Sequence, residues 1–131
     1  MQMNGRALLD TTAVIALFAG EPELVEKVAS RTAVFLCVIV VGELRYGALA
    51  SSRVEQNLAR LDEFAKAITV LPCDTECAMF YAAVKFELRK KGRPIPENDV
   101  WIAAIARQHK LSLISRDTHF QEIDGLELEL L

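Results

Sequence analysis

The sequence predicts an α/β domain in which a mostly parallel sheet of five strands carries helices on both faces. Short runs rich in apolar and β-branched residues alternate with segments of helical periodicity along the whole chain, and this alternation is typical of parallel strands joined by helices. The segment Thr32–Val40 is apolar almost throughout, as expected of a strand that is covered on both faces. The length of 131 residues suits one domain that spans residues 1–131.

The first part of the chain predicts one strand and two helices. The run Arg6–Asp10 is short and apolar and stops at a carboxylate, which indicates a strand. Thr11 and Thr12 are expected to cap the helix that follows, and Gly20 is expected to end it. Pro22 suits the first turn of the second helix. The buried face of that helix is expected to hold three apolar residues: Val25, Val28 and Ala29.

The middle of the chain predicts a strand at Thr32–Val40, two helices and a short strand at Thr69–Leu71. The first of these helices carries the segment Gly42–Ala48. The second has a regular apolar stripe at helical spacing, formed by Val54, Leu58, Leu61, Ala65 and Ile68.

The last part of the chain predicts two helices and two strands. Asp74 or Thr75 is expected to cap a long helix that ends at Gly92, and Asn98 is expected to cap the next one. The inner face of the long helix is formed by Cys77, Phe80, Tyr81, Val84 and Leu88. The two strands are expected at Leu111–Ser115 and, at the edge of the sheet, Leu126–Leu130.

Composition and hydropathy exclude several classes of protein. No apolar run reaches the length of about 18 residues that a membrane helix needs, and Asp10 interrupts the apolar stretch that a signal peptide would require. We therefore expect a cytoplasmic protein without a membrane partner. Three cysteines form no paired framework for disulfides or zinc, which predicts buried free thiols. The net charge of −3 argues against nucleic-acid binding through bulk basicity, but not against binding through a cation.

Four acidic residues lie at the ends of predicted elements. Asp10 ends the first strand, and Asp117 lies two residues past the fourth. Asp99 is in the first turn of a helix, and Glu43 is on the helix after the second strand. Ligands of open parallel sheets bind at the carboxyl ends of the strands, so Asp10 and Asp117 share one crevice if their strands are neighbours. Each acid taken alone also fits a turn or a helix end.

Four carboxylates in one crevice indicate a cation, because their charges repel one another. Oxygen ligands without cysteine or histidine favour a hard ion, Mg²⁺ or Mn²⁺. Such an ion suits the hydrolysis of a phosphodiester by an activated water molecule. The ion also supplies the local positive charge that an acidic nuclease lacks.

Four segments carry a resemblance to a known family: Leu8–Thr12, Val41–Gly47, Asn98–Ala104 and Leu113–Phe120. Together they resemble the PIN domain, and within it the VapC-type toxin ribonucleases of type II toxin–antitoxin systems. The resemblance covers essentially the whole chain. It implies a PIN-like fold and a Mg²⁺-dependent endoribonuclease that acts on transfer or ribosomal RNA. It also implies a cognate antitoxin as partner and a homodimer.

The resemblance assigns roles to individual residues. It implies an acidic catalytic quartet formed by Asp10, Glu43, Asp99 and Asp117. We expect Asp10, Asp99 and Asp117 to hold the metal, and Glu43 to complete the metal site or to orient the attacking water. The resemblance further implies that Thr12 supports Asp10 and that Ser115 lies near the metal.

Other residues near the acids are interpreted from their positions. Arg45 and Arg116 flank two of the acids and are placed to touch a phosphate or to hold the carboxylates. A capping or packing role is favoured for His119 over a contact with substrate. For Trp101, a core or dimer contact is favoured over stacking on a base. The basic run Arg89–Arg93 fits a solvated helix end better than a rim that contacts RNA phosphates.

The sequence leaves two rival functions. A catalytically silent PIN-type module that binds an antitoxin-like protein or RNA is the main alternative. Four intact acidic residues indicate that the site is able to hold a metal, but they do not show that the protein turns over a substrate. A phosphatase of the haloacid dehalogenase type is poorly supported, since it needs a second aspartate where Thr12 stands. The RNA target, the antitoxin, the number of metal ions and the size of the oligomer stay open.

Overall fold

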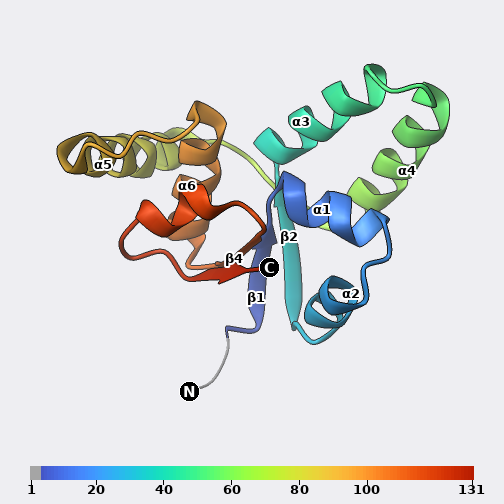
Figure 1. The fold of residues 1–131 in the computed structure, drawn as a ribbon, viewed down its shortest axis with the longest axis horizontal. Coiled ribbons are helices and arrows are strands. Elements are labelled where there is room, and N and C mark those ends of the chain that lie inside the picture. Colours follow the sequence, from blue (N-terminus) through green and yellow to red (C-terminus); the bar gives the residue numbers. More distant parts are fainter. Residues whose placement is uncertain (1–3) are drawn as a thin grey trace.

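The chain folds around a fully parallel sheet of five strands in the order β3-β2-β1-β4-β5 (Figure 1). The structure is a computed structural model that describes residues 4–131. The strands are β1 (Arg6–Leu9), β2 (Ala33–Cys37), β3 (Thr69–Leu71), β4 (Ser112–Ser115) and β5 (Leu128–Leu130). The predicted α/β class, the five strands and the edge position of the last strand are confirmed.

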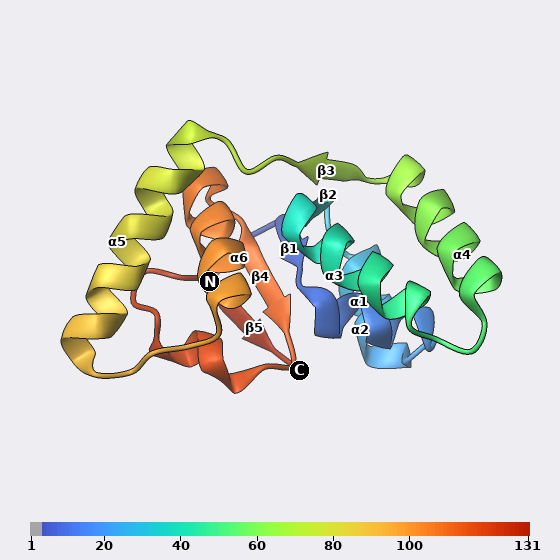
Figure 2. The same cartoon turned by 90° about the horizontal axis from the view of Figure 1, so that it is seen from above.

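Helices cover both faces of the sheet, as predicted. They are α1 (Thr11–Phe18), α2 (Pro22–Ala29), α3 (Val38–Leu49), α4 (Val54–Ala67), α5 (Thr75–Lys91) and α6 (Glu97–His109), followed by a 3₁₀ helix at Thr118–Glu122. Figure 2 shows α5 and α6 on one side of the sheet and α1 to α4 on the other. Within residues 4–131, no helix is long and apolar enough to cross a membrane.

The core is centred on β1, β4 and α6. Ala7, Leu8 and Leu9 of β1 are fully buried, and every residue of β4 is buried. The residues of α6 from 102 to 106 are buried as well. Ala103 and Ala106 are small, so α6 lies close to the sheet and carries Asp99, in its first turn, to the carboxyl ends of the strands.

The second strand is shorter than predicted. β2 ends at Cys37, and α3 begins at Val38 inside the segment Thr32–Val40 that was predicted as one strand. A continuous apolar run does not separate a buried strand from a buried helical turn, which explains the error. The early start of α3 places Glu43 in its second turn.

Two helix starts differ from the prediction. Asp10, and not Thr11 or Thr12, caps α1, since its Oδ1 accepts a hydrogen bond from the backbone N–H of Ala13 at 2.9 Å. α6 begins after Pro96, so Asn98 lies in its first turn instead of at the cap. The side chains of Thr11, Thr12 and Asn98 therefore do not act as helix caps and form other hydrogen bonds.

Burial also differs from the prediction at two places. In α2, Leu24 is the buried residue, whereas Val25 and Ala29 are exposed. This short helix packs on α1, and of the three residues predicted for its inner face only Val28 is partly buried against the core. All three cysteines are free as predicted, but Cys73 is exposed while the other two are buried.

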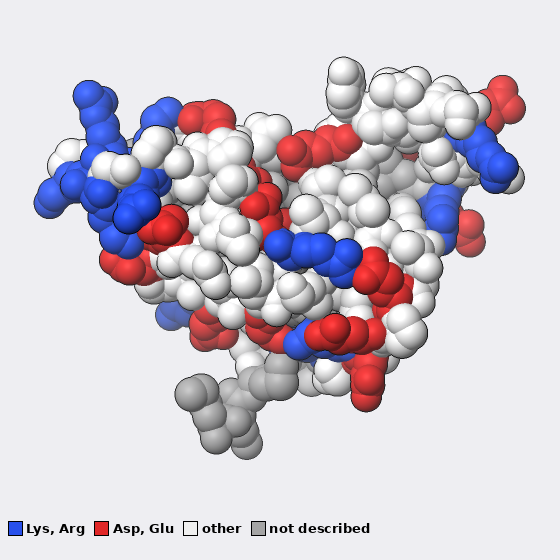
Figure 3. Space-filling view, in the orientation of Figure 1, with Lys and Arg blue, Asp and Glu red and all other residues white. Residues whose placement is uncertain are grey.

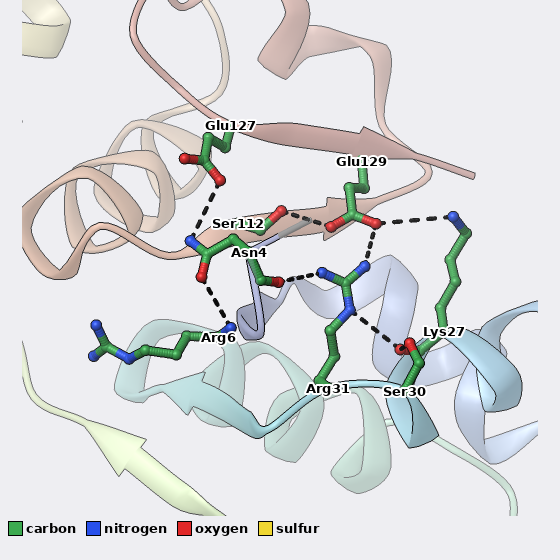
Figure 4. Close-up of polar contacts among 8 residues, drawn as sticks. All are labelled: Asn4, Arg6, Lys27, Ser30, Arg31, Ser112, Glu127 and Glu129. Atoms are coloured by element: carbon green, nitrogen blue, oxygen red, sulfur yellow. Dashed lines mark hydrogen bonds and ion pairs between the residues drawn. The ribbon is translucent and has the colours of Figure 1, made fainter. Parts of the chain in front are cut away.

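A polar network joins the amino end of the sheet (Figure 4). The side chain of Arg31 is 2% exposed and pairs with Glu129 of β5. Its Nη1 also donates to the carbonyl oxygen of Asn4 at 2.7 Å, and Ser112 Oγ of β4 donates to Glu129 at 2.7 Å. Burial raises the pKa of Glu129, but the bonds from Arg31 and Ser112 outweigh it and hold that pKa below its usual value. The network fixes the edge strand to its neighbours.

Candidate active site

Asp10 is held rigidly at the carboxyl end of β1. Its side chain is almost fully buried, and its backbone N–H donates to Ile114 O of the adjacent β4 at 3.2 Å. Thr12 Oγ1 donates to Asp10 Oδ1 at 2.7 Å, and Ser115 Oγ donates to Asp10 Oδ2. β1 and β4 are neighbours, as the shared crevice requires. Both carboxylate oxygens therefore have a fixed orientation.

The hydroxyls of Thr12 and Ser115 also tie the start of the next loop to the site. The backbone N–H of Arg116 donates to Thr12 Oγ1 at 2.9 Å, and that of Asp117 donates to Ser115 Oγ at 2.9 Å. Two hydroxyl groups thus connect Asp10 to the segment that carries Asp117. Thr12 thus contacts Asp10, the residue that the resemblance implies it supports, and Ser115 makes a second contact with the same carboxylate.

Glu43 lies on α3, and its side chain extends toward the start of α1, next to Asp10. Thr11 Oγ1 donates to Glu43 Oε1 at 2.6 Å, and Asn98 Nδ2 lies 3.3 Å from Glu43 Oε2. The sequence reasoning assigned Thr11 and Asn98 to helix caps and missed this role. Their direct adjacency to Asp10 and to Asp99 was the available signal.

Asp99, Asp117 and His119 form the closest cluster. One potential ligand atom from each lies within 4.8 Å of the other two, and His119 Nε2 is 3.1 Å from Asp117 Oδ1. The three come from the first turn of α6 and from the segment after β4. From the sequence, a place for His119 in the site, as a contact with substrate, was the less favoured interpretation.

All four predicted acids and His119 line one open cavity of about 500 Å³. Figure 3 shows acidic side chains in the hollow between the α5–α6 side and the α3 side of the molecule. The structure thus brings together residues that are more than 100 positions apart in the sequence.

The cavity concentrates negative charge. Burial, and next to it the charge of Asp117, raises the pKa of Asp99 to about 6. Burial also raises the pKa of Asp10, although its hydrogen bonds oppose this. Carboxylates that repel one another in this way are stabilised by a cation between them.

The two arginines considered for the site lie outside the cavity. Arg45 Nη1 pairs with Asp62 of α4 at 2.9 Å, and Arg116 pairs with Glu21 at 2.6 Å. In this structure neither holds a carboxylate of the site, and only the backbone of Arg116 contributes, through Thr12.

The side chains of Trp101 and Glu97 contact residues of α5. The ring of Trp101 stacks on Tyr81 with 3.8 Å between the ring centroids, which agrees with the packing role favoured for it. Tyr81 and Lys85 both donate to the carboxylate of Glu97. Glu97 lines the cavity, but its charge is already balanced there by Lys85.

The donors of the cavity suit a hard divalent cation. They are carboxylate oxygens and one imidazole nitrogen, and no thiolate is among them. Hard divalent cations such as Mg²⁺ and Mn²⁺ prefer such oxygen-rich sites. The residues present therefore fit a divalent ion.

Comparison with known proteins agrees with this geometry. The family model of the PIN domain matches residues 7–126. The chain belongs to the PIN domain family. Relatives of this PIN-domain protein include ribonuclease VapC2 of Haemophilus influenzae, 35% identical over 93% of this chain and 95% of the relative. Another is ribonuclease VapC5 of Mycobacterium tuberculosis, 35% identical over 90% and 87%.

Solved structures of the family share the fold. The VapBC2 structure from Rickettsia felis, bound to a DNA fragment from its promoter, aligns with a TM-score of 0.87 and 27% identity over 96% of this chain and 98% of that chain. The VapBC-1 structure from nontypeable Haemophilus influenzae aligns with a TM-score of 0.86 and 28% identity over 95% and 97%. The PIN-domain protein is thus similar throughout to toxin chains of the VapC type.

Proposed function

We propose that this PIN-domain protein is a Mg²⁺-dependent endoribonuclease and the toxin of a toxin–antitoxin pair. The observation that carries the proposal is the convergence of Asp10, Glu43, Asp99 and Asp117 on one cavity at the carboxyl ends of β1 and β4. The ribonuclease names of relatives at 35% identity support it.

Three carboxylates would hold the metal: Asp10, Asp99 and Asp117. When bound, Mg²⁺, or Mn²⁺ in its place, supplies a Lewis acid that activates water and neutralises charge on the phosphate. Thr12 and Ser115 keep the Asp10 carboxylate from rotating. A fixed carboxylate lowers the cost of organising the site before substrate binds.

Glu43 would complete the metal site or orient the attacking water, and in the second role it would also accept the proton of that water. Thr11 donates to one of its oxygens and Asn98 lies within hydrogen-bonding distance of the other, so the carboxylate faces the cavity in one orientation. A general base must be positioned within hydrogen-bonding reach of the water that it deprotonates.

The proposed substrate is RNA. A relative from Shigella flexneri that is 31% identical is named a tRNA(fMet)-specific endonuclease, which makes transfer RNA the first class to test. No lysine or arginine lines the cavity within the described part of the chain. The positive charge that receives a phosphate there would come from the cation.

The proposed partner is an antitoxin protein that covers part of the same surface. An apolar groove of about 260 Å³ runs between α1, α3 and α4 next to Glu43, lined in part by Ile15, Phe18, Leu44 and Leu61. Ile15 is 57% exposed although it is large and apolar, as expected of a side chain that a partner covers. We further propose a homodimer, which would bury exposed apolar side chains of α3 such as Tyr46 and Leu49.

The test is cleavage of a pool of structured RNAs by purified protein free of antitoxin. Reactions contain Mg²⁺, Mn²⁺ or a chelator, and they compare the natural protein with Asp99→Asn. Asp124→Asn is the matched control, because Asp124 is an exposed acid that does not line the cavity. We expect cuts at few sites that require the metal, survive in the control and disappear in Asp99→Asn.

Two negative outcomes have different meanings. A folded protein that binds Mg²⁺ but cuts nothing in this pool would contradict transfer and ribosomal RNA as substrates. A folded protein that neither binds Mg²⁺ nor cuts RNA would favour the catalytically silent binding module.

A further inference from the structure

His119 is the one imidazole that faces the cavity. The chain has two histidines, and the other, His109, is the last residue of α6 at the far end of that helix. His119 belongs to the 3₁₀ helix that follows β4, and its Nε2 lies 3.1 Å from Asp117 Oδ1. Its side chain is 46% exposed, so the core does not explain its position.

Capping does not explain the imidazole either. The cap of the 3₁₀ helix is Asp117, whose side chain accepts from the backbone N–H of His119. The imidazole itself points toward the two carboxylates, Asp99 and Asp117. The capping and packing roles favoured from the sequence therefore leave the side chain unexplained.

We propose that His119 supplies a nitrogen ligand to the divalent ion held by Asp99 and Asp117, and that this nitrogen makes the site prefer Mn²⁺ to Mg²⁺. The inference rests on the proposed metal site and changes its expected selectivity. Its basis is that the three potential ligand atoms lie within 4.8 Å of one another.

The chemistry of the donors gives the direction of the preference. Mg²⁺ binds oxygen ligands in strict octahedral geometry and gives up its waters reluctantly. Mn²⁺ also prefers oxygen ligands, but as the first member of the transition series it accepts an imidazole nitrogen in a less strict geometry than Mg²⁺ does. One nitrogen in an otherwise carboxylate site thus favours Mn²⁺ without excluding Mg²⁺.

The first experiment detects the nitrogen directly. Metal-stripped protein is loaded with Mn²⁺ and examined by electron spin echo envelope modulation, which reports ¹⁴N bonded to the ion. We expect the modulation of a coordinated imidazole in the natural protein and in His109→Gln, and its loss in His119→Ala. Circular dichroism confirms that each variant is folded.

The second experiment measures selectivity by calorimetric titration with Mn²⁺ and Mg²⁺. His119→Ala should weaken Mn²⁺ binding by about tenfold or more, and it should weaken Mg²⁺ binding less. His119→Asp replaces the nitrogen by an oxygen and should lower the ratio of Mn²⁺ to Mg²⁺ affinity while it keeps a tight site.

The outcomes separate this inference from the proposed function. Tight Mn²⁺ binding and RNA cleavage without any ¹⁴N modulation would overturn the role of His119 and leave the nuclease in place. An unchanged affinity ratio in His119→Asp would do the same. Failure of every form to bind either metal would overturn both proposals.

Discussion

At the scale of single residues, Asp99 shows how negative charge in the cavity affects the stability of the fold. Burial and the neighbouring Asp117 raise its pKa to about 6. Between the unfolded value of 3.8 and this pKa, the folded state binds more protons than the unfolded state. The free energy of unfolding therefore falls as pH rises through this window, and the metal-free protein carries the full loss above about pH 6.

We predict that Asp99→Asn stabilises the metal-free protein at pH 7.5 while it abolishes RNA cleavage. The gain should be about 1 kcal/mol, because solvent screens this half-buried carboxylate, and it should shrink toward pH 4. Urea unfolding in chelator at the two pH values measures it, with Asp124→Asn as control. Equal destabilisation at both pH values would show that the charge of Asp99 does not lower the stability of the metal-free protein.

Ser115 offers a second prediction, because its hydroxyl serves two site residues. It donates to Asp10 and accepts from the backbone N–H of Asp117. Ser115→Ala should cost about 1–3 kcal/mol of stability, since buried polar groups lose their partners, and it should lower kcat for RNA cleavage.

Ser112 is the matched control for Ser115. It is also a buried serine of β4 that donates to a carboxylate, Glu129, but at the opposite end of the strand. Ser112→Ala should lower stability to a similar extent and leave cleavage unchanged. A parallel loss of kcat in both variants would mean that Ser115 acts through stability alone.

The convergence of Asp10, Asp99 and Asp117 was predictable at this scale because each stands at the end of a recognisable element, whereas Glu43, in the second turn of α3, was found through the resemblance. Thr11, Asn98 and His119 were not predictable, because their roles depend on distances between segments far apart in the sequence. Thr11 of α1 meets Glu43 of α3, for instance, and no local pattern encodes that contact. Their own neighbourhoods predicted caps and packing instead.

At the scale of elements, the edge strand β5 depends on one buried ion pair. β5 has three residues, and Glu129 at its centre is held by Arg31 and Ser112. We predict that Arg31→Met lowers stability by about 2–4 kcal/mol, because it leaves a largely buried carboxylate with only the longer and more exposed contact to Lys27, at 3.8 Å. Hydrogen exchange should speed up first in β5.

Arg107→Met is the control for Arg31→Met. Arg107 pairs with Glu87 at 3.0 Å, but both side chains are more exposed than those of Arg31 and Glu129. A loss below about 1 kcal/mol is expected there. Equal losses in the two variants would contradict the weight given to burial.

The identity of the elements was predictable and several of their ends were not. Periodicity separates helices from strands over a dozen residues, and glycines mark ends, as Gly92 does at the end of α5. β2 ends at Cys37, where the chain leaves the sheet. The apolar segment Thr32–Val40 contains no residue that signals this end. Pro96 takes the cap position of α6 because its backbone is already extended.

At the scale of the whole molecule, charge is distributed unevenly. The net charge is −3, yet basic side chains gather around the end of α5 while acids fill the hollow at the cavity (Figure 3). Local potentials, and not the net charge, decide how a phosphate chain approaches. Parallel topology followed from the alternation of elements, whereas the full strand order required the structure.

The parallel order of the strands gives the two ends of the chain different surroundings. β1 starts at the amino edge of the sheet, beside the Arg31 network, and runs toward the cavity. β5 runs in the same direction, and Leu131 donates its backbone N–H to the carbonyl oxygen of Ser115, the residue whose hydroxyl donates to Asp10. An affinity tag or fused protein joined ahead of β1 would therefore emerge away from the cavity, whereas one joined after Leu131 would emerge beside it and compete for the space in which we propose that RNA binds.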